Sequence, residues 1–220
     1  MFQYVLFDLD GTLTDPKTGI TSCVQYALAD AGIEEPDLDK LEPFIGPPLT
    51  DSFREFYGFD DEQIKRAIDK YHERFDEKGI FENEIIEGIP ELLKALKDAG
   101  CRVSIASSKP RPLVIRILEH FEITQYFDTV VGSEFDGRFA TKEAVVEEAL
   151  KQLVPSVYEK EDVAMVGDRK FDIQGARAHG LTGIGVSFGY AGEHELEDAG
   201  ADYIVDTVEE LQRLLLQGSL

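Results

Sequence analysis

The chain has 220 residues, with 44 Asp and Glu against 22 Lys and Arg, and a formal net charge of −22. A surface this acidic repels nucleic-acid phosphates and anionic membranes, so we expect neither nucleic acid nor a membrane as a partner. No apolar run is long enough to cross a bilayer, and the first residues do not resemble a signal peptide. With only two cysteines, far apart in the sequence, these features predict a cytoplasmic protein.

Two aspartates follow the first predicted strand. The apolar run Tyr4–Phe7 leads into Asp8-Leu9-Asp10-Gly11-Thr12, and alternate residues of an extended chain point to the same side. The two carboxylates therefore repel each other unless a cation lies close by. A polar turn after a strand is the simpler explanation, but a hard divalent ion such as Mg²⁺, bound by carboxylates and a substrate phosphate, resolves the repulsion. The motif indicates metal-assisted phosphate chemistry.

Helix and strand patterns alternate from residue 88 onward. Strands are predicted at 102–106, 129–131, 162–166, 183–186 and 203–205, and helices at 88–99, 111–121, 141–153, 170–179 and 207–216. Such alternation predicts an α/β fold with a parallel sheet that is covered on both faces.

The region before residue 88 has a different pattern. Residues 19–82 are helical by pattern, interrupted by Gly and Pro, and show no strand signal. We therefore predict two parts: an α/β core formed by residues 1–14 and 88–220, and a helical insertion formed by residues 15–87. The connections 14–18 and 83–88 are the expected hinge.

Ligands of open parallel sheets collect at the carboxyl ends of the strands, so the other strand ends are informative. The strand at 102–106 is followed by Ser107, Ser108 and Lys109, whose hydroxyl and backbone N–H groups could bind phosphate oxygens or simply cap the next helix. The strand at 162–166 is followed by Asp168.

Asp172 lies one helical turn after Asp168. Acidic side chains at the start of a helix also interact favourably with the helix dipole, so a stabilising role at the helix start is an alternative explanation for these two aspartates. Four acids that converge on one crevice nevertheless require a cation. Lys142 opens a predicted helix, where a lysine is mildly unfavourable, so a carboxylate or phosphate partner is expected; Lys109 is the rival candidate for the same electrostatic role.

These motifs together resemble the haloacid dehalogenase superfamily, in particular phosphatases with a helical cap inserted after the first motif. The four matching motifs appear in the expected order, and they are Asp8–Thr12, the strand end at Ser107, Lys142, and Gly167–Asp172. The segment from Gly189-Tyr190 to Asp202 is similar to the phosphoglycolate phosphatase-like and nucleotidase-like branch. The resemblance implies a Rossmann-like core with an α-helical cap, and phosphate-monoester hydrolysis of small phosphorylated metabolites.

The resemblance also implies residue roles. Asp8 would be the nucleophile that forms an aspartyl-phosphate, and Asp10 would be the general acid and base. Ser107 and Lys142 would bind the phosphoryl oxygens. The metal, Mg²⁺, would be held by Asp8, Asp10, Asp168 and Asp172, with Asp10 contributing its backbone carbonyl and Asp172 reached through water or orienting Lys142.

Substrate-binding residues are predicted in both parts of the chain. In the core they are Gly11, Thr12, Ser108 and Lys109. In the insertion, a Gly-Pro-Pro break makes a rigid loop that could project over the crevice, so Gly46, Pro47 and Arg54 are candidate specificity residues. An ordinary turn between helices is the alternative explanation for this loop.

Three alternative functions share parts of this pattern. A dehalogenase of the same fold would need neither a metal nor the extra carboxylates. A phosphomutase of the β-phosphoglucomutase-like type shares the aspartyl-phosphate step, but the resemblance implies a His–Lys device after the first motif, and the first histidine here is His72. A phospho-accepting signalling module has no reason to carry a helical insertion of this size.

Overall fold

The computed structural model describes residues 1–154 and 157–218, which divide into two compact units. One unit comprises Met1–Thr14 and Ile85–Leu220, and the other comprises Asp15–Glu84. The second boundary lies three residues before the predicted one at 87/88, because β3 (Glu84–Ile85) pairs with β2 (Thr14–Asp15) at the junction. The two chain segments that connect the units, at residues 14–15 and 84–85, therefore form one two-stranded sheet.

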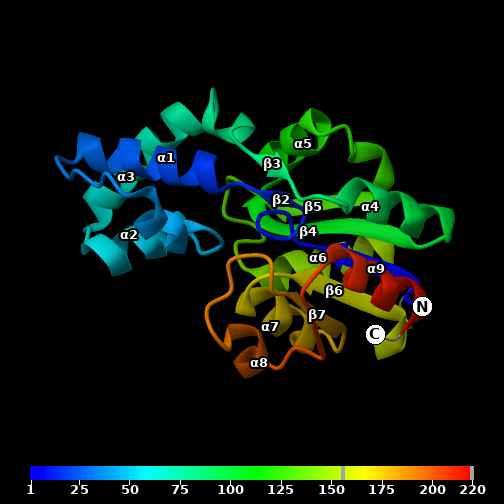
Figure 1. Cartoon of the computed structure of the whole chain (residues 1–220). Coiled ribbons are helices and arrows are strands. Elements are labelled where there is room, and N and C mark those ends of the chain that lie inside the picture. Colours follow the sequence, from blue (N-terminus) through cyan, green and yellow to red (C-terminus); the bar gives the residue numbers. More distant parts are fainter. Residues whose placement is uncertain (155–156, 219–220) are drawn as a thin grey trace. The chain divides into compact units, whose positions relative to one another are not determined.

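A six-stranded parallel sheet forms the centre of the first unit (Figure 1), with the strand order β5-β4-β1-β6-β7-β8. The strands are β1 (Tyr4–Phe7), β4 (Arg102–Pro110), β5 (Thr129–Ser133), β6 (Val163–Gly167), β7 (Thr182–Val186) and β8 (Tyr203–Val205). The predicted α/β architecture is confirmed. Since β1 pairs with both β4 and β6, the residues that follow these three strands are brought to one edge of the sheet.

Helices cover the sheet in two packed groups. In the first group, α6 packs on α7, and α7 packs on α8; in the second, α4 packs on α9, while α5 packs on β4 and β5. The helices are α4 (Ile89–Asp98), α5 (Arg111–His120), α6 (Lys142–Leu153), α7 (Lys170–Ala178), α8 (Glu195–Ala199) and α9 (Val208–Gln217). Short α8 has no counterpart among the predicted elements, and β4 extends past the predicted end at 106 through a register shift between Ser107 and Pro110.

The second unit is helical, as the pattern of residues 19–82 predicts. Its α-helices are α1 (Lys17–Asp30), α2 (Leu49–Tyr57) and α3 (Asp61–Phe75), and its 3₁₀ helices are η1 (Leu38–Phe44) and η2 (Gly79–Phe81). Helices α1 and α3 pack against each other, and Phe44 lies 5.0 Å from Phe53 between ring centres in an aromatic cluster. This unit therefore has an apolar core of its own.

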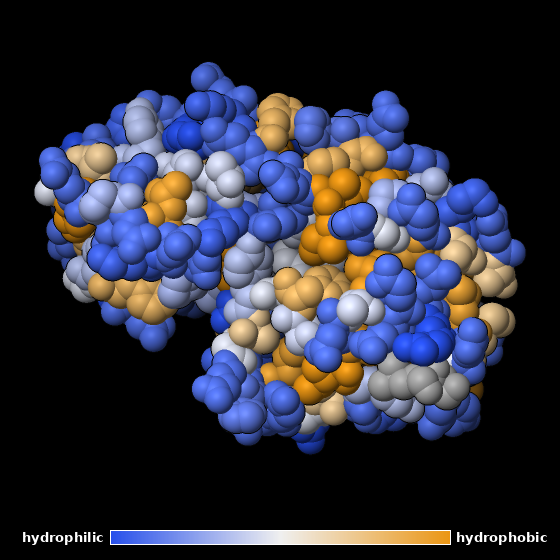
Figure 2. Space-filling view, viewed as in Figure 1, coloured by the Kyte–Doolittle hydropathy of each residue, from blue (hydrophilic) through white to orange (hydrophobic). Residues whose placement is uncertain are grey.

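Hydrophilic side chains cover much of the visible face of each unit, as expected for a chain with a net charge of −22 (Figure 2). Among the described residues, no helix has both the length and the apolar composition required to cross a membrane.

Asp128 links helix α4 to the sheet in the first unit. Its carboxylate accepts hydrogen bonds from the Val103 N–H and from Lys97 Nζ, each at 2.8 Å. Burial acts to raise the pKa of Asp128, but these two hydrogen bonds outweigh it and hold the pKa below its usual value. A depressed carboxyl pKa stabilises the fold above the unfolded-state pKa, and that contribution is lost as the pH falls through the folded-state pKa.

We predict that Asp128→Asn lowers the free energy of unfolding at pH 7 by about 1 kcal/mol, or roughly 2–4 °C in Tm. The difference from wild type should shrink as the pH falls below about 4, where the unfolded-state carboxyl takes up a proton before the folded-state carboxyl does. Thermal unfolding followed by circular dichroism between pH 3 and pH 8 measures both effects. Asp98→Asn, which removes an exposed ion pair with Lys94, is the control and should change stability by less than about 0.5 kcal/mol.

Candidate active site

Three buried aspartates meet at the carboxyl edge of the sheet. Asp8 follows β1, Asp168 follows β6, and Asp172 lies in the first turn of α7; one carboxylate oxygen from each lies within 4.8 Å of the others. Hard carboxylate oxygens at this spacing are the donor set that Mg²⁺ takes in proteins. The residues present therefore fit the metal that the sequence motifs imply.

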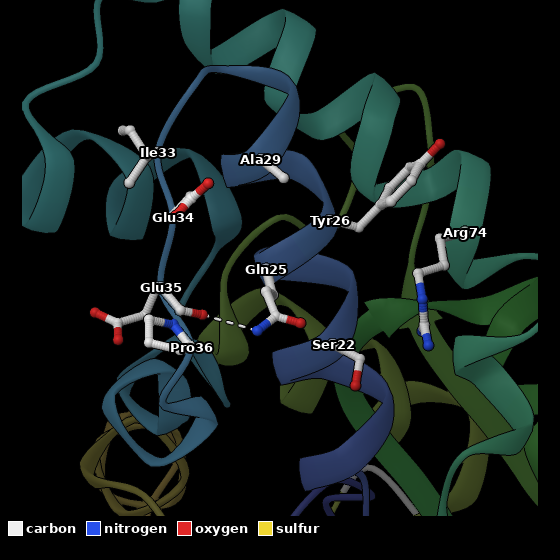
Figure 3. Close-up of a pocket in the computed structure, with 9 residues that line it drawn as sticks. All are labelled: Ser22, Gln25, Tyr26, Ala29, Ile33, Glu34, Glu35, Pro36 and Arg74. Carbon is white, nitrogen blue, oxygen red and sulfur yellow. Dashed lines mark hydrogen bonds between the residues drawn. The ribbon is translucent and has the colours of Figure 1, made fainter.

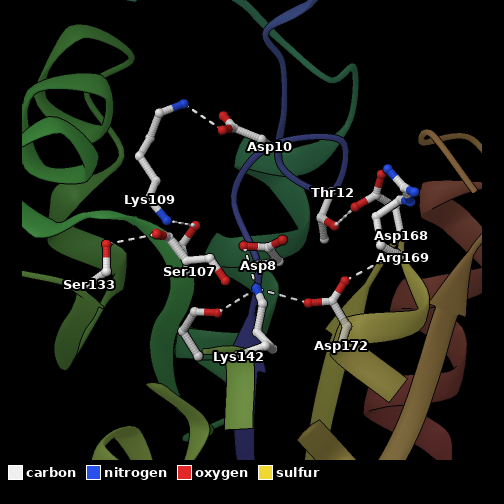
Figure 4. Close-up of polar contacts among 12 residues, drawn as sticks. Asp8, Asp10, Thr12, Ser107, Lys109, Ser133, Lys142, Asp168, Arg169 and Asp172 are labelled. Carbon is white, nitrogen blue, oxygen red and sulfur yellow. Dashed lines mark hydrogen bonds and ion pairs between the residues drawn. The ribbon is translucent and has the colours of Figure 1, made fainter. Parts of the chain in front are cut away.

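Lys142 is the cation that the structure places among these acids (Figure 4). Its Nζ lies 2.8 Å from an Asp8 oxygen and 2.8 Å from an Asp172 oxygen, and it donates to the Ala106 carbonyl at 3.0 Å. Burial acts to lower the pKa of Lys142, but the two carboxylates outweigh it, so the pKa is raised and the ammonium stays charged. The sequence predicts a carboxylate or phosphate partner for Lys142, and the structure shows two carboxylates, those of Asp8 and Asp172.

One lysine does not balance three carboxylates. Burial, and then the neighbouring Asp172 and Asp8, raise the pKa of Asp168 well above its usual value. Burial also raises the pKa of Asp172 to about 6, although Lys142 acts against this shift. Both shifts have the same cause, which is negative charge held away from water without enough positive charge nearby. A divalent cation would supply that charge.

The backbone around Asp168 comes too close for side chains. A Cβ added at Gly11, Gly189 or Gly167 would overlap the carboxylate of Asp168 or of Asp172. Gly11 also has φ +78°, a left-handed conformation that side chains disfavour. Glycine at these positions therefore lets the backbone approach the Asp168 and Asp172 carboxylates closely.

Asp168 is held at both of its oxygens. The Thr12 hydroxyl donates to Oδ1 at 3.3 Å, and the Tyr190 N–H donates to Oδ2 at 2.8 Å. Thr12, predicted as a substrate-binding residue, thus contacts a site carboxylate in this structure. The sequence does not indicate the contact of Tyr190 with Asp168, because the donor is a backbone N–H group that every residue except proline carries.

Asp10 points its carboxylate away from the group of three. It forms an ion pair with Lys109, and both side chains are largely buried. Lys109 and Lys142 therefore contact different members of the Asp8–Asp10 pair, so the two candidate lysines have separate places in the site (Figure 4).

The last part of β4, where its register with β5 shifts, carries Ser107 and Ser108. The Lys109 N–H donates to Ser107 Oγ at 3.3 Å, and Ser133 Oγ, at the end of β5, donates to the Ser108 carbonyl at 2.7 Å. Ser107 is buried beside Ala106, whose carbonyl accepts from Lys142. Support from Ser133 is a contribution that sequence reasoning missed, since β5 lies about 25 residues away in the chain.

The candidate specificity residues lie in the helical unit. Gly46 and Pro47 connect η1 to α2, and Arg54, on α2, forms an exposed ion pair with Asp61 at 2.6 Å. Their part in substrate selection stays a prediction. The same unit contains a pocket of about 510 Å³ between α1, α3 and residues 33–36, where Gln25 Nε2 donates to the Glu35 carbonyl at 2.8 Å (Figure 3). None of the predicted site residues lines this pocket.

Comparison with known proteins places this fold and site in one family. The family model of the haloacid dehalogenase-like hydrolases matches residues 5–186. The chain belongs to this family, as the four motifs predict, and is a hydrolase of the haloacid dehalogenase type.

Proteins with different names are similar to this chain. A 5'-nucleotidase of Pseudomonas aeruginosa is 45% identical over 196 residues, which cover 89% of this chain and 87% of that protein. The tyrosine-protein kinase PtkA of Mycobacterium tuberculosis is 38% identical over 216 residues, which cover 97% of this chain and 72% of that protein. A crystal structure of a predicted phosphatase from Clostridium acetobutylicum is 46% identical, has a TM-score of 0.91, and covers 99% of each chain.

We predict that Gly11→Ala weakens Mg²⁺ binding by at least about tenfold, because the added methyl group would displace the Asp168 carboxylate. Isothermal titration calorimetry with MgCl₂ measures the change. Gly32→Ala is a matched control, since Gly32 has the same φ of +78° but open space around its Cβ position. That variant should lose a little stability through backbone strain and keep its Mg²⁺ affinity. Equal affinities in both variants would contradict the close approach at Asp168.

Proposed function

We propose that this hydrolase is a Mg²⁺-dependent phosphatase that acts on small-molecule phosphate monoesters through an aspartyl-phosphate on Asp8. The observation that carries the proposal is the cluster of Asp8, Asp168 and Asp172 around Lys142, with Asp10 two residues beyond the nucleophile. The cluster offers a nucleophile, a cation-binding set and a fixed positive charge within one buried site. The names of two similar proteins, a 5'-nucleotidase and a predicted phosphatase, support phosphate-ester hydrolysis.

Each residue of the site would have its own role in the reaction. The Asp8 carboxylate would attack phosphorus, and Asp10 would give a proton to the leaving alcohol and later take one from the hydrolytic water. Lys142 and Ser107 would donate to the phosphoryl oxygens as their charge shifts in the transition state. Asp172 would orient Lys142, whose Nζ it contacts at 2.8 Å.

The metal would be held by the carboxylates of Asp8 and Asp168 and the backbone carbonyl of Asp10, with Asp172 contributing directly or through water. When bound, Mg²⁺ supplies the positive charge that lets an anionic phosphate approach the Asp8 carboxylate. The buried surroundings of the three carboxylates strengthen this electrostatic effect.

The proposal predicts that Asp8→Asn lowers phosphate release by about 10⁴-fold or more, since an amide is a poor nucleophile. Phosphate release is measured with a panel that contains nucleoside monophosphates, phosphoglycolate, sugar phosphates and pyrophosphate, with MgCl₂ or with EDTA. Asp98→Asn, an exposed aspartate of the same unit, is the control for the loss of one charge and should keep wild-type rates.

Three results bear on the proposal. Mg²⁺-dependent release that Asp8→Asn abolishes would support it. Interconversion of a bisphosphate and a monophosphate without net release would favour the phosphomutase alternative. A stable phosphoprotein without turnover would favour a phospho-accepting module.

We further propose that the helical unit selects the leaving group, through the loop with Gly46 and Pro47 and through Arg54. Arg54→Ala should then change the ranking of KM values across the panel by about threefold or more while keeping the dependence on Mg²⁺. Arg66→Ala is the matched control, because Arg66 also lies in this unit and forms a surface ion pair, with Asp30 at 2.8 Å. An unchanged ranking in Arg54→Ala would remove Arg54 from the set of specificity residues.

A further inference from the structure

The loop between β7 and α8 reaches the site through its backbone. Its Tyr190 N–H donates to Asp168 Oδ2 at 2.8 Å, and a Cβ at Gly189 would overlap the Asp168 side chain. The orientation of Asp168 therefore depends on where this loop lies. Loops are more mobile than the strands that they connect, so a side-chain contact between this loop and the strand end would restrict its movement.

Glu195, the first residue of α8, makes that connection. One carboxylate oxygen, Oε1, accepts from Arg169 Nε at 2.9 Å and from the Lys170 N–H at 2.9 Å. The other oxygen, Oε2, accepts from the Gly192 N–H at 3.0 Å. One carboxylate thus receives donors from both chain segments that border Asp168: the segment that follows it directly, and the loop that contains Tyr190.

The burial and the charges of the Arg169–Glu195 ion pair indicate that it helps to hold these two segments together. The side chains of Arg169 and Glu195 are 14% and 15% exposed, so the ion pair is largely shielded from water. Burial acts to raise the pKa of Glu195, but its three hydrogen-bond donors outweigh that effect and lower the pKa. His194, directly before it, has a left-handed φ of 60°, an uncommon conformation for a residue other than glycine. This uncommon backbone conformation occurs directly before Glu195, whose side chain contacts Arg169.

We propose that Glu195 is a positioning residue for the metal site: its carboxylate joins the Arg169–Lys170 segment to the Gly192 loop and so sets the orientation of Asp168. The inference rests on the proposed function only in taking Asp168 as a metal ligand. Residues that orient metal ligands typically change metal affinity by about 10- to 100-fold when they are replaced.

Glu195→Gln is the sharpest test of this proposal. Glutamine has nearly the same shape, but its single carbonyl oxygen cannot accept on both sides, so an NH₂ group faces one set of N–H donors. We expect the Kd for Mg²⁺, measured by titration calorimetry on the full chain, to rise by about tenfold or more. Glu193→Gln is the matched control, because its side chain is 91% exposed and it removes the same charge two residues away.

The kinetic readout separates positioning from a general loss of structure. With phosphate release as the assay, Glu195→Gln should raise the Mg²⁺ concentration required for half-maximal rate, and excess Mg²⁺ should restore most of kcat. A purely structural role would lower Tm in EDTA and leave the Kd of the folded protein unchanged. If Glu195→Gln does not fold, Arg169→Lys replaces it, since lysine keeps the charge but has no Nε–H at this position.

Each outcome decides the proposal. A raised Kd in Glu195→Gln or Arg169→Lys, with Glu193→Gln unchanged, supports it even if no phosphate ester in the panel is hydrolysed. A wild-type Kd in the folded variant overturns it and leaves the phosphatase proposal standing. Absence of Mg²⁺ binding by the wild-type chain overturns both proposals.

Discussion

The site is organised around buried negative charge that the chain alone does not neutralise. Asp8, Asp168 and Asp172 lie together away from water, and Lys142 is the ammonium that contacts two of them. Burying a charge without a partner costs several kcal/mol, so such a cluster persists in a fold only when other interactions compensate for it. Much of the surrounding structure holds these carboxylates in place, by two means.

The parallel sheet is the first of these means. The pairing of β1 with β4 and β6 brings the ends of three strands together, and each end carries residues of the proposed site. The strands are buried along their length, so their register is set by a large apolar core and not by the polar residues at their tips. Stability and function are thus separated: the core supplies the free energy that keeps the repelling carboxylates together.

The second means is close approach of the backbone. Gly11 and Gly189 bring two loops against Asp168, and Gly167 lies directly against Asp172. Backbone N–H groups can then bind the carboxylates at short range, which orients them without adding another ionisable group. Glu195 connects two chain segments in a comparable way, because its one carboxylate accepts hydrogen bonds from three donors on these segments.

The sequence alone determined the α/β class and a helical region before residue 88, and it singled out the three aspartates that the fold brings together, because hydrophobic periodicity and the spacing of acids after strands are local properties of the chain. It left Lys142 and Lys109 as rival candidates for one electrostatic role, because the contacts of Lys142 with Asp8 and of Lys109 with Asp10 join residues far apart in the chain. Tertiary structure also decided the contacts of Tyr190 and Glu195. These depend on the path of the loop that follows β7, the strand beside β6 in the sheet, and contacts between residues so distant in sequence are set by global packing.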